Sequence, residues 1–289
     1  MIMNNVATVN YTPQQVINRL IDLSYIPFVY APVEEKNGKA RIIPFFMWQH
    51  VPKELIKAAQ MYRDNYNNPF VRSAIIQFER ENGILHKGGI SYGTPHKSVI
   101  KKIMEAHKKN RLPFEWVIVN KASGTKIPEM LHIWKHSYKK GAHGRFIWHT
   151  LVNTGVLHST PNGTWPIYQR LPRTTMRGVF PVPIGRSEFD VLKNSTVPAW
   201  LGSSEKISAV GMVSGSYVRW VPYNDPGILW VNYFHDGMGI HYYPRASYGF
   251  PQSAGCVEEP LANSKITYHF LHYGVPVTIS AQKFSDQTT

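Results

Sequence analysis

The spacing of apolar residues changes near residue 115, and this change constrains the fold more than any other feature. Before it, residues 13–23, 53–66, 71–81 and 98–107 repeat at helical spacing, as in Val16, Ile17, Leu20 and Leu23. After it, short apolar runs alternate with turn clusters, a pattern typical of strands. We therefore expect an α+β chain, with a small helical N-terminal domain followed by a β-rich domain.

The predicted domain boundaries follow from composition. Residues 1–106 form the helical domain, and residues 107–114, which are short, polar and basic, form a linker. Residues 115–280 form the β-rich domain, which ends in one helix over 262–273 and a closing strand, and residues 281–289 form a tail. Residues 179–219 are rich in Gly, Ser and Pro with weak periodicity, so we expect an inserted lobe or flap without regular structure.

Composition excludes several classes of protein. The 289 residues include 43% hydrophobic and 17% charged residues, which favours a folded core over disorder. No stretch approaches the roughly 20 apolar residues of a membrane helix, so we expect no membrane span. A single cysteine excludes internal disulfides and cysteine-rich zinc sites. Residues 1–10 show no export signal.

The net charge of +14 is spread over the whole chain. Residues 1–115 and residues 116–289 each hold 16 basic and 9 acidic side chains. An even basic surface favours polyanionic surroundings, and nucleic acid, anionic lipid and a bacterial cell wall all qualify.

The densest chemical signal lies in residues 240–257. The only cysteine, Cys256, follows Ser253, Ala254 and Gly255, and His241 lies fifteen residues upstream. A cysteine becomes a nucleophile when a nearby base takes its proton. Gly255 lets backbone amides approach a reacting carbonyl and stabilise an oxyanion. Spacing alone leaves open the alternative of a buried, inert cysteine and a structural histidine.

Other segments form an ordered set with this one: Asn153–Gly155, Thr160–Ile167, Arg173–Gly178, Asp225–Phe234, Arg245–Ser253 and Gly274–Ile279. This set resembles L,D-transpeptidase catalytic domains of the YkuD type over residues 115–280. Residues 15–25 and 71–83 resemble a small helical peptidoglycan-binding domain. In that domain Ser24 and Glu79 replace the usual Gly and Gln, and residues 30–66 would be a long insertion.

The resemblance implies a β-sandwich type catalytic domain and roles for individual residues. Cys256 would be the nucleophile, His241 its base, the backbone carbonyl of Tyr242 the partner of His241, and the amide of Gly255 an oxyanion donor. The residues implied to bind substrate are Ser253, Ala254, Met176, Tyr223 and Arg245.

The implied reaction joins two peptidoglycan stem peptides. A thioester would form with loss of terminal D-alanine, and an amine of a second stem would resolve it into a 3→3 cross-link. The implied partner is therefore peptidoglycan, with anionic wall polymers possible and no nucleic acid, and the implied location is extracytoplasmic. No metal or organic cofactor is implied, and carbapenems acylate the family's cysteine.

Three departures from the family pattern keep alternatives open. Ala254 stands where many members have His, Glu258 where Arg or Asn is frequent, and Tyr242 where Gly or Ser is common. The alternatives are a hydrolytic L,D-carboxypeptidase or lytic factor that uses the same site, and an inactive wall-binding protein. His269 and His272 could share a metal, but solvated helix residues are the better interpretation.

Overall fold

The computed structural model describes residues 10–34, 40–121, 127–138, 142–198 and 205–281. The N-terminal part contains the helices α1 (Pro13–Asp22), α2 (Lys53–Gln60), α3 (Pro69–Glu81) and α4 (Lys97–Glu105) and the antiparallel pair β1 (Phe28–Glu34) and β2 (Ala40–Phe46). Local signals explain two helix starts. Thr12 forms a capping box with Gln15 before α1, and Asn68 caps α3.

The remaining strands of the described residues form two five-stranded sheets and one small pair. The first sheet has the order β5-β4-β3-β14-β6, and the second has the order β10-β11-β12-β13 with β7 also paired to β11. The bounds of the first sheet's strands are β3 (Phe114–Asn120), β4 (Met130–His136), β5 (Arg145–Leu151), β6 (Gly163–Pro166) and β14 (Pro276–Ser280). Those of the second are β7 (Gln169–Pro183), β10 (Val210–Val213), β11 (Ser216–His235), β12 (Met238–Tyr242) and β13 (Val257–Glu259). This mixture of helices and sheets confirms the α+β prediction.

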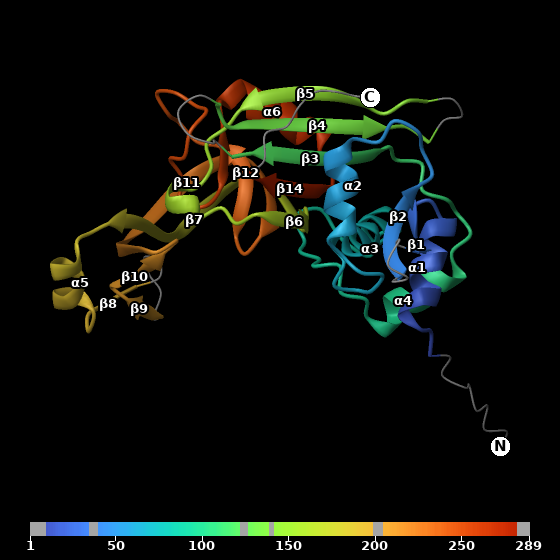
Figure 1. Ribbon diagram of the computed structural model, residues 1–289, viewed down its shortest axis with the longest axis horizontal. Coiled ribbons are helices and arrows are strands. Elements are labelled where there is room, and N and C mark those ends of the chain that lie inside the picture. Colours follow the sequence, from blue (N-terminus) through green and yellow to red (C-terminus); the bar gives the residue numbers. More distant parts are fainter. Residues whose placement is uncertain (1–9, 35–39, 122–126, 139–141, 199–204, 282–289) are drawn as a thin grey trace, which may run out of the picture.

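Strand β3 is buried on both faces and joins the two parts of the chain. Trp116 and Ile118 pack into the core of α1, α3 and α4, whereas Val117 and Val119 pack into the core shared with the second sheet. Figure 1 shows the N-terminal helices lying beside the first sheet, to which β3 belongs. The helical part therefore buries apolar surface that the sheet would otherwise expose.

The predicted linker 107–114 packs closely against the N-terminal part. Asn110 is buried, its backbone amide donates to the carbonyl of Leu23 at 2.8 Å, and its side chain donates to the carbonyl of Ser24 at 3.2 Å. Phe114 already belongs to β3. The division into two domains stays a prediction, because the two parts share one hydrophobic cluster.

Regular structure in residues 179–219 corrects the expectation of an irregular segment. The long paired strands β7 and β11 carry α5 (Arg186–Leu192), β8 (Thr196–Pro198), β9 (Lys206–Ser208) and β10 at their far end, which projects away from the first sheet in Figure 1. These elements are short, and the buried residues among them are few, so their sequence shows little periodicity. The late helix is α6 (Leu261–Phe270), slightly shorter than predicted.

Candidate active site

A cavity of about 260 Å³ lies where the β7–β11 pair meets β12 and the loop before β13. It is lined by Met176, Phe180, Tyr223, Asp225, Ile228, His241, Tyr243, Arg245, Ser253, Ala254, Cys256 and Glu258. Seven of the nine residues singled out from the sequence therefore line one cavity. The other two, Tyr242 and Gly255, were predicted to act through backbone groups, and each is adjacent in the chain to a lining residue.

Cys256 lies at this cavity directly before β13. Strands β12 and β13 run parallel with His241 opposite Glu258, so the chain returns Cys256 to the same side of the molecule as His241. The thiol is half-buried among apolar and aromatic side chains, and its Sγ accepts a hydrogen bond from the amide of Gly239 at 3.5 Å. Burial raises the pKa of Cys256 to about 12, so the resting group is a neutral thiol.

His241 is buried with its two ring nitrogens in different environments. Nδ1 lies 2.9 Å from the carbonyl oxygen of Tyr242, which can only accept, so Nδ1 carries the proton. Nε2 has no hydrogen-bond partner among the described residues. Burial lowers the pKa of His241, which keeps the ring neutral and leaves Nε2 as a proton acceptor.

The loop that presents Cys256 is held by hydroxyl groups. Ser253 Oγ donates to the carbonyl of Cys256 at 2.6 Å and accepts from the amide of Gly255 at 3.0 Å. Thr160 Oγ1 donates to the carbonyl of Gly255 and accepts from the amide of Gly155, both at 2.7 Å. The Gly255 amide, predicted as an oxyanion donor, is thus already used by Ser253, which leaves the adjacent amide of Cys256 as the candidate donor.

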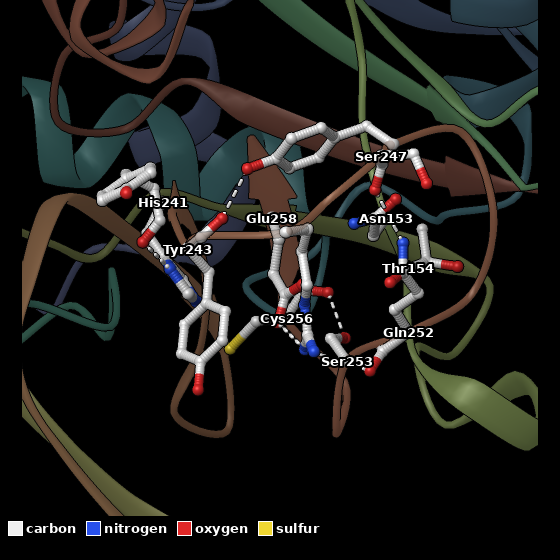
Figure 2. A network of polar contacts seen from close by, with 12 residues as sticks. Asn153, Thr154, His241, Tyr243, Ser247, Gln252, Ser253, Cys256 and Glu258 are labelled. Atoms are coloured by element: carbon white, nitrogen blue, oxygen red, sulfur yellow. Dashed lines mark hydrogen bonds and ion pairs between the residues drawn. The ribbon is translucent and has the colours of Figure 1, made fainter. Parts of the chain in front are cut away.

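Glu129 supports this loop from behind, and sequence reasoning missed it. Its buried carboxylate accepts from the backbone amide of Thr154 at 2.5 Å and from Thr154 Oγ1 at 2.7 Å. The carbonyl of Thr154 in turn accepts from the amides of Gln252 and Ser253. Figure 2 shows Cys256 directing its sulfur toward Tyr243, on the side away from Thr154. A single Glu between a turn and a strand carries no motif that would identify it.

Arg245 and Glu258 form a two-pronged ion pair at the cavity wall. Arg245 Nε and Nη2 each donate to the Glu258 carboxylate at 2.8 Å, and the guanidinium lies 4.6 Å from the ring centre of Tyr243. This pair raises the pKa of Arg245. The negative charge of Glu258, two residues after Cys256, is therefore neutralised at the cavity wall by Arg245.

The other predicted residues line the cavity from the β7–β11 side or from the loop. Met176 and Tyr223 lie on the long strands, and Ala254 lies in the loop. Burial raises the pKa of Tyr223 above its usual range, so its hydroxyl stays neutral. Asp225 also lines the cavity and accepts from Tyr243 Oη at 3.2 Å, a role that the sequence did not predict.

The described residues contain no group of three or more His, Cys, Asp or Glu side chains placed to hold a metal ion. His269 Nδ1 lies 2.7 Å from the carbonyl of Lys265, and His272 Nδ1 lies 3.3 Å from Gln77 Nε2. Within the described part of the chain, no helix is long and apolar enough to cross a membrane.

Comparison with known proteins gives one family match and several solved structures. The family model for the L,D-transpeptidase catalytic domain, YkuD, matches residues 115–279. No curated protein matches the chain. An Ldtfm–avibactam carbamoyl enzyme is 14% identical, with 96% of this chain and 85% of that chain covered and a TM-score of 0.37. An L,D-transpeptidase from Stackebrandtia nassauensis is 13% identical, with 93% and 90% covered and a TM-score of 0.31.

Proposed function

The chain belongs to the L,D-transpeptidase (YkuD) family, and from this premise we propose that it transfers acyl groups between peptidoglycan stem peptides through a thioester on Cys256. The family acts on peptidoglycan, which implies an extracytoplasmic location. The observation that carries the proposal is the free Nε2 of His241 in the same cavity as the Cys256 thiol.

In the acylation half of the reaction, Cys256 attacks the carbonyl of the diamino acid at position three of a donor tetrapeptide. At rest the thiol is protonated and the imidazole is neutral. His241 Nε2 therefore takes the thiol proton as the carbon–sulfur bond forms. The same proton then passes to the nitrogen of terminal D-alanine as the carbon–nitrogen bond breaks. D-Alanine leaves and a thioester remains.

In the second half, the side-chain amine of an acceptor stem attacks the thioester carbonyl. His241 Nε2 takes a proton from this amine, the new carbon–nitrogen bond forms, and the carbon–sulfur bond breaks. The sulfur recovers the proton from His241, and the product is a 3→3 cross-link. Water in place of the amine gives the tripeptide instead, which is L,D-carboxypeptidase activity.

Backbone and side-chain contacts support this division of roles. The carbonyl of Tyr242 holds the His241 tautomer that leaves Nε2 as acceptor. Ser253 holds the loop through its hydrogen bonds to Gly255 and Cys256, and we assign stabilisation of the oxyanion to the backbone amide of Cys256. Met176 and Tyr223 are assigned to the donor side of the cavity.

We assign a structural role to the N-terminal part, because α1, α3 and α4 bury one face of β3. Wall binding by this part stays a prediction. A truncation is a poor test of it, since removal would expose Trp116 and Ile118.

The experiment follows D-alanine release and acyl-enzyme mass with a donor tetrapeptide. We expect turnover by the wild type, no acyl-enzyme with Cys256→Ala, and roughly 10²- to 10⁴-fold slower acylation with His241→Ala. His269→Ala, which removes an exposed histidine on α6, is the matched control. Undiminished turnover by Cys256→Ala would overturn the proposal, and product analysis separates cross-links from trimmed tripeptides.

A further inference from the structure

The charged side chains around the cavity do not cancel, and the imbalance is negative in a chain of net charge +14. Arg245 and Glu258 neutralise each other through two hydrogen bonds. Burial lowers the pKa of His241, so the ring adds no positive charge at rest. The carboxylate of Asp225 is left without a cationic partner in any salt bridge of the described residues.

The backbone fixes Asp225 at the cavity wall. The pairing of β11 with β7 shifts register between Asp225 and Ile228, and Gly227 adopts a φ of +78°, which favours glycine. This bulge lies beside the cavity, and Tyr243 Oη donates to Asp225 Oδ2 at 3.2 Å. One hydroxyl leaves most of the acceptor capacity of the carboxylate unused.

We propose that Asp225 binds the side-chain ammonium of the diamino acid in the donor stem and so sets the enzyme's preference for a cationic third residue. The inference rests on the proposed acyl transfer and adds a specificity-determining residue to it. An ammonium group supplies the donors that a carboxylate prefers, and such charge-assisted bonds are stronger than neutral ones.

The chemistry favours the donor over the acceptor as the source of this ammonium. The acceptor amine must lose its proton before it attacks, and a carboxylate that stabilises the protonated form would slow that step. The side-chain amine of the donor takes no part in bond making and can stay charged throughout. Asp225 also repels the terminal carboxylate of the donor, which favours one orientation of the peptide in the cavity.

The test compares two donor tetrapeptides that differ only in the third residue, which carries either a free or an acetylated side-chain amine. We expect wild-type kcat/KM for D-alanine release to be about 10- to 100-fold higher for the free amine. Asp225→Asn should remove most of this preference, because it lowers kcat/KM for the free-amine donor and leaves kcat/KM for the acetylated donor unchanged. Asp236→Asn, which removes an equal charge from a highly exposed position in the β11–β12 turn, should keep the preference.

Three outcomes would overturn the proposal while leaving the acyl transfer intact. The wild type could show no preference between the donors. Asp225→Asn could lower kcat/KM for both donors equally, which would mean that Asp225 only stabilises protonated His241. Alternatively, the variant could acylate normally and lose only the step with acceptor amine, which would place the ammonium on the acceptor. Absence of D-alanine release by the wild type with either donor would instead reject the proposed function itself.

Discussion

Substitution of Glu259 by Gln should change how stability depends on pH. Glu259 lies on β13 with no exposed surface, and its Oε1 accepts from Thr267 Oγ1 at 2.6 Å. Oε2 has no partner among the described residues. Burial raises the pKa of this carboxyl from 4.5 to about 8. The folded protein therefore keeps the proton over a pH range in which the unfolded chain releases it.

The sign of the effect follows from proton binding. Between pH 4.5 and about 8 the unfolded state binds fewer protons at this site than the folded state, so stability falls as pH rises. Each pH unit costs about 1.4 kcal/mol, or about 5 kcal/mol over the whole window. Gln keeps the Oε1 acceptor for Thr267 and does not titrate, so the variant loses this slope.

Urea unfolding of wild type and Glu259→Gln at pH 5, 6 and 7 measures the effect. The difference in free energy of unfolding, variant minus wild type, should increase by about 1.4 kcal/mol for each unit by which the pH rises. Glu105→Gln removes an exposed carboxylate on α4, and its free energy of unfolding should depend on pH nearly as that of the wild type does. Parallel curves for Glu259→Gln and wild type would refute the claim that burial holds the proton on this carboxyl.

Three further predictions test the thiol, the loop and the packing of the N-terminal part. Alkylation of Cys256 by iodoacetamide should rise about tenfold per pH unit from pH 7 to 9, because burial raises its pKa to about 12, and a plateau below pH 9 would contradict this. Thr160→Val should slow acylation about tenfold by releasing the carbonyl of Gly255, whereas Thr160→Ser should stay near wild type; equal rates for both variants would disprove the role of the hydroxyl. Gly274→Ala and Gly237→Ala both place a side chain at positive φ, but only the Cβ added at position 274 would clash with a backbone atom, the carbonyl oxygen of Ser73 in α3. Gly274→Ala should therefore lower Tm further than Gly237→Ala, and an equal loss of Tm in both variants would count against this contact.

Periodicity and short motifs were informative where the structure is local. The helical spacing of Val16, Ile17 and Leu20 corresponds to α1, and the helix predicted over residues 71–81 corresponds to α3, which begins two residues earlier at Pro69. The α+β class follows from the same patterns. These features depend on contacts within a few residues, which a single sequence contains.

Features that depend on distant contacts were not predictable. α5 and β8 to β10 are short and mostly exposed, so little apolar patterning marks them. Glu129 and Asp225 act through partners 25 and 18 residues away in the chain. Glu129 lies in none of the segments that carry the resemblance, and Asp225 lies in one of them without a role that the sequence assigns to it. The pairing of Arg245 with Glu258 likewise appears only when β13 returns beside β12.

If Cys256 is a nucleophile and His241 is its base, a carbapenem should acylate Cys256, and the intact mass of the protein after incubation with the drug reports this. We expect one covalent adduct on the wild type, none on Cys256→Ala, and much slower adduct formation on His241→Ala. Each variant should unfold cooperatively by circular dichroism, so that loss of the adduct reports chemistry. A folded wild-type protein that forms no adduct, or an adduct that persists in Cys256→Ala, would contradict the claim.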